Sequence, residues 1–303
     1  MRSLNEEWSA VNRRFETQLA QLYQEAASEP QQRLFEAMNY SLLAGGKRLR
    51  PLLVYAFCEA CGGCAEEADP AALAVEMLHT YSLIHDDLPA MDNDDYRRGR
   101  LTSHKVYGEA LAILAGDALL TDAFRLLTTG SLPAGKAVAC VAVLAQNAGP
   151  YGMVGGQVLD MASEERTLSE EEVRNIQTRK TGCLIRAACE MGAICAGADA
   201  GQREAARRYA DGIGLAFQIR DDVLDVTGDA AKLGKAVGVD AEKNTFVRLY
   251  GLERCAGMIH SETAAAVNAL SCFQKPDLLT DLAWFWRNGI INPLFVESIH
   301  EAD

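Results

Sequence analysis

The stretch YSLIHDDLPAMDNDDYRRGR, residues 81–100, joins the end of an apolar helix to a dense cluster of carboxylates and a basic pair. Apolar residues at the spacing of one helix face lead into it: Leu73, Met77, Tyr81 and Ile84. Pro89 biases the residue before it away from helical geometry, so the helix should end at or just after Asp87. Carboxylates are unfavourable at a helix C-terminus, which carries partial negative charge. Because Mg²⁺ binds carboxylates together with substrate phosphates, the stretch predicts a divalent metal site.

A second acidic cluster lies in GLAFQIRDDVLD, residues 214–225, which has a helical pattern. Four polar side chains are spaced to share one helix face: Gln218, Asp221, Asp222 and Asp225. Like charges four residues apart destabilise an isolated helix by roughly 0.2–0.5 kcal/mol a pair. Two such clusters on apolar helices can face each other across a cavity in a helical bundle. Together they indicate metal-assisted chemistry on a phosphate substrate.

Basic residues lie in short loops near the first cluster. In GGKRLRP, residues 45–51, two glycines end one helix and Pro51 starts the next, and the three cations between them could bind a phosphate. A solvated basic turn is the alternative. Arg97 and Arg98 directly follow the acidic residues. They either face phosphates held by metal ions or form salt bridges with Asp94 and Asp95.

Further polar candidates lie elsewhere along the chain. His79 precedes Asp86 by seven residues and would be within reach of a bound diphosphate, although a helix-borne histidine is more often a packed residue. GGQVLD, residues 155–160, should open a helix, and Lys180 with Thr181 in a later helix could donate to a phosphate oxygen. A glycine-punctuated segment after the second cluster predicts a mobile lid that supplies cations. Its charged residues include Asp229, Lys235, Asp240 and Lys243.

Nearly every segment has a helical pattern, and alanine is abundant, which favours helices. Residues 4–27 form an amphipathic stripe that Pro30 interrupts, and residues 34–43 resume it. Hairpins are not expected, because alternating runs bounded by Asn-Gly or Asp-Gly turns are absent from the sequence. No linker or shift of composition divides the chain. The prediction is therefore one all-α domain over residues 1–303, with about ten to thirteen helical segments.

Composition excludes several classes of partner. The net charge of −13 argues against nucleic acid and against a basic membrane-binding surface. The uncharged run 137–159 contains glycines and Pro150 near its middle, which favours a buried helix followed by a turn over a membrane span. The nine cysteines, with no apolar signal segment in the first ten residues, favour free thiols in a reducing cytoplasm. Cys58, Cys61 and Cys64 lack the fourth cysteine and the proline of an iron–sulfur motif, so a helix end at Gly62 is expected instead.

In combination and in order, these motifs resemble the trans-prenyltransferases, the polyprenyl synthase family that builds linear isoprenoid diphosphates. The similarity runs from Gly45 to about Gly251 and is greatest to the short-chain bacterial members that make farnesyl diphosphate. It implies an all-α orthogonal helical bundle around a central cavity, usually a homodimer. It also implies two substrates, isopentenyl diphosphate and an allylic diphosphate.

The resemblance further implies roles for single residues. The diphosphate of isopentenyl diphosphate would be bound by Lys47, Arg50, His79 and Arg98. Three Mg²⁺ ions, with Mn²⁺ as an alternative, would be bound by Asp86, Asp87, Asp92, Asp221, Asp222 and Asp225. The allylic diphosphate would be held by Arg97, Lys180, Thr181, Gln218, Lys235 and Lys243. Direct catalytic roles would belong to Lys180, Lys235, Asp86 and Asp221.

The sequence departs from the family pattern in three places. Asn93 stands where many relatives have a fourth aspartate. The loop between Gly238 and Thr245 is about two residues shorter, which bears on Lys243. The segment from Phe273 onward matches the family poorly, and no site is assigned to it.

Product length should depend on the helix that ends at Asp86, because the growing chain would run down beside it. Tyr81 lies five residues earlier, about 7.5 Å along the helix. With Met77 and Ser82 it would close the pocket at a fifteen-carbon product, farnesyl diphosphate; a plain core aromatic is the alternative. A geranylgeranyl or geranyl diphosphate synthase shares every motif. A terpene cyclase and a non-catalytic subunit of a hetero-oligomeric synthase are the more distant alternatives.

Overall fold

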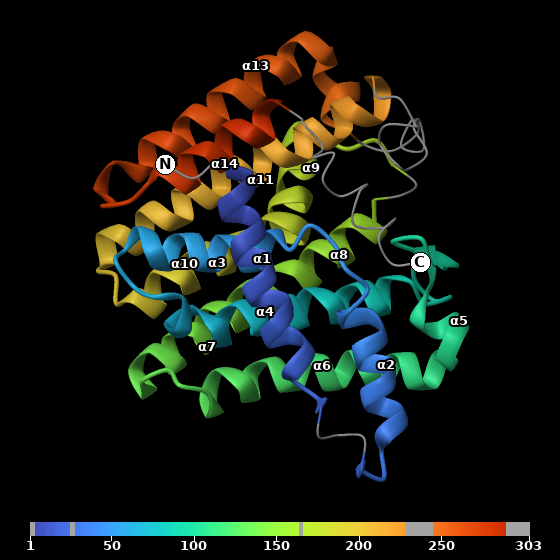
Figure 1. The fold of residues 1–303 in the computed structure, drawn as a ribbon. Helices are drawn as coiled ribbons and strands as arrows, with labels where there is room; N and C mark the ends of the chain where they lie inside the picture. Colours follow the sequence, from blue (N-terminus) through green and yellow to red (C-terminus); the bar gives the residue numbers. More distant parts are fainter. Residues whose placement is uncertain (1–3, 25–27, 164–165, 228–244, 289–303) are drawn as a thin grey trace.

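The computed structural model describes residues 4–24, 28–163, 166–227 and 245–288, and these are almost entirely helical, which confirms the all-α prediction (Figure 1). The first half of the described chain contains α1 (Leu4–Gln21), α2 (Gln32–Leu42), α3 (Leu49–Ala60), α4 (Ala65–Asp86), β1 (Tyr96–Arg97), β2 (Arg100–Leu101), α5 (Ser103–Tyr107) and α6 (Glu109–Thr129). The second half contains α7 (Ala134–Ala148), α8 (Met153–Met161), α9 (Glu170–Gln177), the π-helical turn η2 (Thr178–Gly182), α10 (Cys183–Ala196), α11 (Ala200–Thr227), α13 (Phe246–Ala269), the 3₁₀ turn η3 (Leu270–Cys272) and α14 (Asp277–Asn288).

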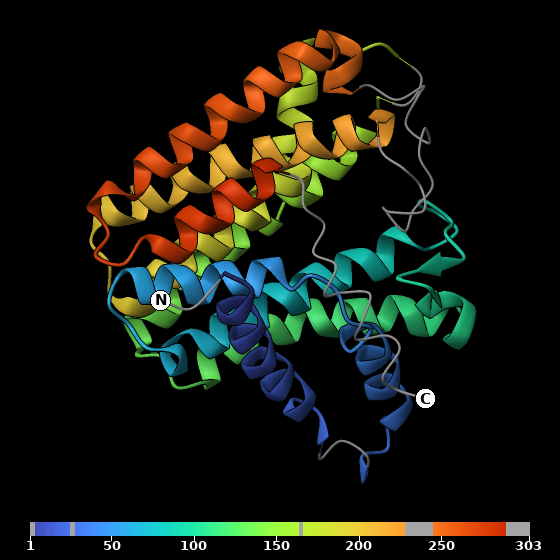
Figure 2. The same cartoon turned by 45° about the horizontal axis from the view of Figure 1, so that its top comes forward.

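The long helices pack in successive layers. α4 lies between α6 on one side and α3 and α10 on the other, and α11 separates α10 from α13 (Figures 1 and 2). α1 and α2 run across these layers (Figure 1). Most of α4 and α10 is buried, because both helices are apolar on nearly all sides. The inner layers therefore supply rigid supports for the polar ends of α4 and α11.

The end of α4 is where the sequence predicts it. The helix ends at Asp86, and Asp87 is its C-cap residue. Pro89, three residues after Asp86, lies in the turn that follows. At its N-terminus, the backbone N–H of Cys64 donates to Glu67 Oε2 at 3.0 Å, as in a capping box. The preceding helix ends at Ala60, and Gly62 adopts a φ of 86°, which confirms the expected helix end at the cysteine motif.

One prediction about local structure is wrong. Tyr96–Arg97 and Arg100–Leu101 form a short antiparallel hairpin, although hairpins were not expected. Its turn is made by Arg98 and Gly99, which have φ values of 54° and 73°. Two successive positive values are the geometry of the tight hairpin turn. Glycine at the second position makes the turn accessible without the Asn-Gly or Asp-Gly signal.

The uncharged run is divided as the sequence predicts. Ala134–Met161 is the one stretch of the described chain that is long and apolar enough to cross a membrane by length and composition. The structure breaks it into α7 and α8 with a turn at Gly149–Gly152, and α7 packs against α10. The run is therefore a packed helix followed by a turn and a second helix, as the sequence predicts.

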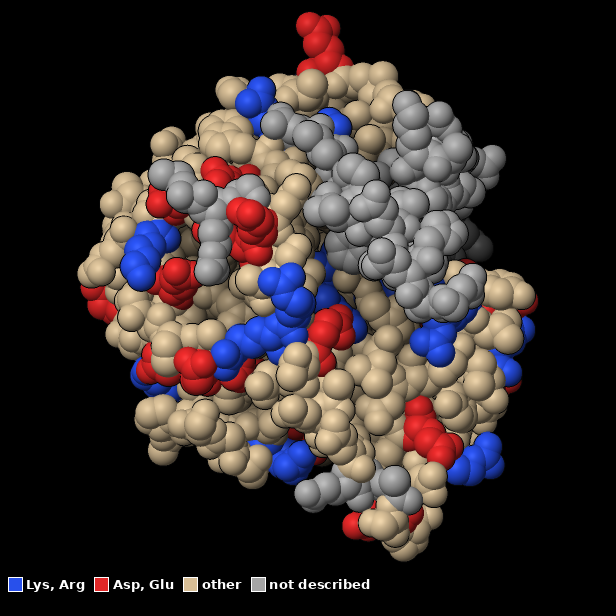
Figure 3. Space-filling model, in the orientation of Figure 1, with Lys and Arg blue, Asp and Glu red and all other residues tan. Residues whose placement is uncertain are grey.

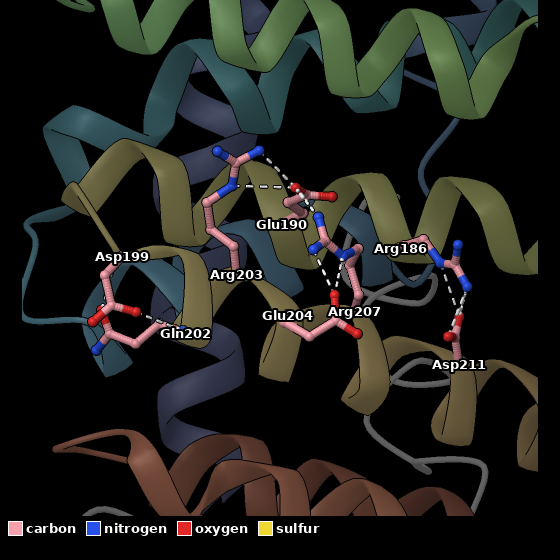
Figure 4. Close-up of polar contacts among 8 residues, drawn as sticks. All are labelled: Arg186, Glu190, Asp199, Gln202, Arg203, Glu204, Arg207 and Asp211. Carbon is pink, nitrogen blue, oxygen red and sulfur yellow. Dashed lines mark hydrogen bonds and ion pairs between the residues drawn. The ribbon is translucent and has the colours of Figure 1, made fainter.

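Ion pairs join α10 to α11 (Figure 4). The buried Glu190 accepts from Arg203 at 2.8 Å and from Arg207 at 2.7 Å. Arg186 binds both carboxylate oxygens of Asp211, at 2.6 and 2.7 Å. These contacts fix α11, which carries the second acidic cluster, against α10, which directly follows the turn that contains Lys180 and Thr181.

Acidic and basic side chains are interspersed on the face shown in Figure 3, so the net charge of −13 does not form one continuous acidic field there. All nine cysteines are free thiols, as predicted.

Candidate active site

The acidic end of α4 is folded back on itself. The backbone N–H of Asp92 donates to the carbonyl oxygen of Asp86 at 2.8 Å, which returns Asp92 to the helix end. Burial raises the pKa of Asp86 from 3.8 to about 6, and repulsion from Asp92 and Asp87 adds to it, against the attraction of Lys180 and Arg97. Asp86 is thus the point where carboxylates and cations from three parts of the chain meet.

Arg97 takes up one of the predicted metal ligands. Its guanidinium donates to Asp87 Oδ1 at 2.6 Å and lies 3.5 Å from Asp94 Oδ2, while Asp95 pairs with Lys105 at 2.7 Å. The salt-bridge alternative from the sequence thus holds for Asp94 but not for Asp95, and the shortest ion pair of Arg97 is with Asp87, which that alternative did not include. An allylic diphosphate would have to compete with Asp87 for Arg97, or a cation would have to replace Arg97 on Asp87.

Arg98 has a different environment. Its Nη1 donates to the carbonyl oxygen of Gly45, and its guanidinium lies against Gly46. A Cβ at Gly46 would be 2.8 Å from Arg98 Cζ, so a glycine is needed there on steric grounds as well as for its φ of 127°. The glycine pair thus makes room for the guanidinium of Arg98, which follows it by more than fifty residues in the sequence. On the other side of the loop, Lys47 Nζ lies 6.0 Å from the ring centroid of Phe217 on α11.

Three of the residues predicted to bind isopentenyl diphosphate form an electrostatic group. Burial, reinforced by Arg50 and Arg98, holds the pKa of His79 well below its ordinary value, so His79 is neutral. Burial also lowers the pKa of Arg50 and of Arg98. Arg50 Nε is buried and has no hydrogen-bond partner among the described residues. Cations with lowered pKa values and an unused buried donor are the features of an anion-binding site.

The second acidic cluster occupies the last turns of α11. Asp225 is buried, with 6% of its surface exposed, and Asp222 Oδ2 accepts from the backbone N–H of Phe246 at 2.7 Å. The latter bond ties the cluster to the start of α13. Gln218 and Asp221 are half-buried on the same helix. The predicted lid residues Lys235 and Lys243 lie outside the described residues, together with Asp229 and Asp240.

Lys180 and Thr181 lie in the π-helical turn η2, a local geometry that is frequent at functional sites. Lys180 Nζ donates to Asp160 Oδ2 at 2.7 Å. α8 crosses this turn at Gly156, where a Cβ would be 2.3 Å from the backbone nitrogen of Lys180. On the opposite side, a Cβ at Gly214 of α11 would be 3.6 Å from Gly182. Small residues thus bring α8 and α11 close to the turn that carries Lys180.

The carboxylates fit a hard divalent cation by their chemistry. Among the residues that the structure describes, no group of three or more His, Cys, Asp or Glu side chains could hold a metal ion by itself. However, the raised pKa of Asp86 beside Asp87 and Asp92 reflects unfavourable negative charge that a cation would relieve. Carboxylate oxygens are also the ligands that Mg²⁺ prefers. A site completed by substrate phosphates agrees with both observations.

The predicted floor residues are packed into the apolar core. Met77 is fully buried and Tyr81 is 7% exposed. The Tyr81 ring meets the His85 ring edge-on at 5.6 Å between centroids, and His85 in turn occupies the space above Gly116 of α6. Ser82 Oγ donates to the carbonyl oxygen of His79 at 2.9 Å. Tyr81 therefore lies about one turn below Asp86, and His85 connects it to α6.

Glu76 and Asp160 have no role in the sequence predictions, and Arg48, one of the three loop cations predicted to bind a phosphate, is buried and bound to the protein itself. Arg48 and Glu76 form a buried ion pair at 2.9 Å, and Asp160 holds Lys180. Glu76 could have been noticed in the sequence, because an acidic residue on the apolar face of a helix, three residues before His79, needs a buried partner. Nothing in the pattern distinguishes Arg48 from its basic neighbours.

Comparisons with known proteins agree with this geometry. A family model described as Polyprenyl synthetase matches residues 31–270. A farnesyl diphosphate synthase from Micrococcus luteus is 49% identical over 246 residues, which are 80% of this chain and 84% of that protein. A geranylgeranyl diphosphate synthase from Cyanophora paradoxa is 50% identical over 225 residues, covering 73% of this chain and 75% of the relative. Among solved structures, a geranyltransferase from Legionella pneumophila has a TM-score of 0.83 at 35% identity, covering 95% of this chain and 99% of that one.

Proposed function

Because the chain belongs to the polyprenyl synthetase family, we propose that it is a trans-prenyltransferase that condenses isopentenyl diphosphate head-to-tail with allylic diphosphates, giving farnesyl diphosphate. The observation that carries the proposal is the end of α4. There, Asp86 has a raised pKa because it is partly buried beside other carboxylates, and Arg97 and Lys180 lie near it. A separate group of cations, which includes Arg50 and Arg98, lies beside His79. Two neighbouring seats for diphosphate are what a condensation of two diphosphates requires.

The isopentenyl diphosphate seat consists of Lys47, Arg50, His79 and Arg98. The unused Arg50 Nε and the lowered pKa values of Arg50 and Arg98 support it, since a bound anion would supply the missing partner charge. Burial and the neighbouring arginines hold the pKa of His79 low before an anion binds, so the ring can offer an N–H as a hydrogen-bond donor. Binding through fixed cations leaves the isopentenyl double bond free to react.

The allylic diphosphate is held between the two acidic clusters. Its metal ligands are Asp86, Asp87 and Asp92 on one side, and Asp221, Asp222 and Asp225 on the other. Mg²⁺ bound there supplies charge neutralisation and Lewis acidity for the departure of the diphosphate; Mn²⁺ could substitute. Arg97, Lys180, Thr181 and Gln218 hold the phosphate oxygens, together with Lys235 and Lys243 beyond the described residues.

The side chains of this protein act by preorganised electrostatics. Lys180 and Lys235 stabilise the leaving diphosphate. The carboxylates of Asp86 and Asp221 would hold the Mg²⁺ that binds its oxygens, since carboxylates alone repel a diphosphate. The allylic cation is attacked by the isopentenyl double bond, and a proton is then lost. No side chain in the group is an evident general base, so the released diphosphate accepts that proton. The apolar surroundings of Tyr81 keep water from the cation.

Product length is set by the wall below Asp86. Tyr81, with Met77 and Ser82 on the same helix, ends the pocket at the farnesyl length. The burial of Tyr81 and its contact with His85, backed by α6, support a rigid floor. Geranylgeranyl diphosphate is the second candidate product, because a relative named for it is 50% identical to this chain.

We propose a homodimer as the assembly. Support comes from exposed apolar side chains on three consecutive helices: Ile113, Leu114, Val138, Val154 and Val158. Free thiols agree with a cytoplasmic location. The single domain over residues 1–303 stays a prediction.

One assay tests the function. The protein is incubated with Mg²⁺, isopentenyl diphosphate and, in turn, each allylic diphosphate from five to fifteen carbons, and the products are sized by mass spectrometry. Farnesyl diphosphate from the two shorter primers is the expected result. Geranylgeranyl diphosphate would replace the proposed product, and no product from any primer would favour a non-catalytic subunit.

A further inference from the structure

Arg48 is the most buried of the three cations in the GGKRLRP loop. Only 3% of its surface is exposed. Its Nε donates to Glu16 Oε1 at 2.6 Å, its Nη1 to Glu76 Oε1 at 2.9 Å and its Nη2 to the Leu42 carbonyl at 2.7 Å. The guanidinium also lies 5.6 Å from the ring centroid of Phe15. Arg48 is thus fully engaged inside the fold and cannot itself reach a substrate.

Its backbone is also in an unusual state. Arg48 adopts φ 47° and ψ 38°, the left-handed conformation that few residues other than glycine and asparagine adopt readily. It directly follows Lys47 and is the N-cap residue of α3, whose second residue is Arg50. The direction of both substrate-binding cations therefore depends on this one turn. The side-chain bonds of Arg48 to Glu16, Glu76 and Leu42 hold the turn in place.

Glu76 connects the same anchor to the rest of the cationic seat. It is buried on α4, three residues before His79. It is also the strongest attractive charge acting on both Arg50 and Arg98. One buried carboxylate thus balances Arg48 directly and the two substrate-facing arginines through space.

Glu16 brings the N-terminal helix into the arrangement. α1 lies outside residues 31–270, the part that matches the family model. Glu16 joins it to Arg48, and Arg14, two residues earlier, joins it independently to Asp69 of α4 at 2.6 and 2.9 Å. The two tethers hold α1 on the bundle, but only the tether through Glu16 touches the loop.

We propose that Arg48 is a positioning residue for isopentenyl diphosphate, locked by Glu16 and Glu76 so that Lys47 and Arg50 face its diphosphate. Through Glu16, α1 therefore contributes to the position of the substrate-binding loop. The inference rests on the proposed function and extends it to residues that touch no substrate.

Steady-state kinetics on three variants test the proposal. Arg48→Asn removes the guanidinium but keeps a residue that tolerates the left-handed turn. Glu16→Ala cuts the tether to the loop on a half-exposed helix position, and Arg14→Ala is its matched control. We expect the KM for isopentenyl diphosphate to rise about tenfold in Arg48→Asn and about threefold in Glu16→Ala. The KM for the allylic substrate should stay within about twofold.

Arg14→Ala should lower the melting temperature and leave both KM values within about twofold, because it loosens α1 without touching the loop. An unchanged KM for isopentenyl diphosphate in Arg48→Asn and Glu16→Ala would overturn the role of Arg48 alone. An equal rise in Arg14→Ala would do the same, since the effect would then be general loosening. A wild-type protein that forms no condensation product would overturn the proposed function and this inference together.

Discussion

Replacing Asp86 by asparagine should stabilise the metal-free protein while abolishing condensation. Burial and the neighbouring carboxylates raise the pKa of Asp86 from 3.8 to about 6 in the folded protein. Its ionised form is therefore disfavoured by folding and costs stability at neutral pH. Asparagine has nearly the same shape without the charge. The site thus trades stability for a carboxylate that its proposed chemistry needs.

The size and sign of the effect follow from the pKa change. One pKa unit is about 1.4 kcal/mol, which gives about 3 kcal/mol at most, and solvent screening at this half-buried position reduces it to roughly 1–2 kcal/mol. The folded pKa is the higher one, so between pH 3.8 and about 6 the folded protein binds more protons than the unfolded chain. Wild-type stability therefore falls with rising pH in that window, and the penalty is fully present above about pH 6.

Urea unfolding in EDTA, from pH 4 to pH 8, measures this directly. The Asp86→Asn variant should exceed the wild type by roughly 1–2 kcal/mol above pH 6, and the difference should shrink toward zero near pH 4. Asp281→Asn, at an exposed position on α14, is the control and should stay within about 0.5 kcal/mol of the wild type. A variant that is no more stable at pH 7, or whose advantage does not depend on pH, would refute the electrostatic account of this helix end.

Three further substitutions probe the rest of the site. Tyr81→Ala should lengthen the product by at least one five-carbon unit and cost about 2–4 kcal/mol of stability. The control Tyr55→Ala, at a buried tyrosine on α3, should cost stability without changing the product. An unchanged product from Tyr81→Ala would remove Tyr81 as the floor of the pocket. Gly156→Ala should lower the free energy of unfolding by about 1–3 kcal/mol and lower kcat, because the new Cβ meets the backbone of Lys180. The control Gly135→Ala, where a Cβ on α7 has open space, should change neither quantity. Equal effects in the two variants would argue against close packing at η2. Glu190→Gln should lower the free energy of unfolding in urea by about 3 kcal/mol and leave the KM values unchanged. The control Glu204→Gln, at an exposed position, should lower it by less than about 1 kcal/mol. A changed KM in Glu190→Gln would mean that the ion pairs between α10 and α11 do more than hold the helices together.

The sequence predicts the helices and their ends well where a local signal exists. Pro89 places the end of α4 correctly, and Pro150 with its flanking glycines places the break between α7 and α8. The acidic clusters were found because they violate a local rule, with carboxylates at a helix C-terminus and on a single helix face.

Features that depend on tertiary contacts were not predictable in this way. The hairpin at Tyr96–Leu101 has no alternating pattern of apolar and polar residues that would predict it. Its turn is stabilised instead by a glycine at one position and by the contact of Arg98 with the loop at Gly45. The π-helical turn η2 lies against Gly156 and Gly214, which are distant from it in sequence, so no local pattern marks it. The burial of Arg48 depends on Glu16 and Glu76, and without these partners the three basic residues of the GGKRLRP loop cannot be told apart.

The most direct test of the central claim is a crystal structure of the protein with Mg²⁺, isopentenyl diphosphate and an allylic thiolodiphosphate that cannot ionise. The account predicts the allylic diphosphate between the cluster at Asp86 and the cluster at Asp221, bridged to both by metal ions. It predicts the isopentenyl diphosphate on Lys47, Arg50, His79 and Arg98. Diphosphates bound elsewhere, or metal ions that contact only one of the two acidic clusters, would contradict it.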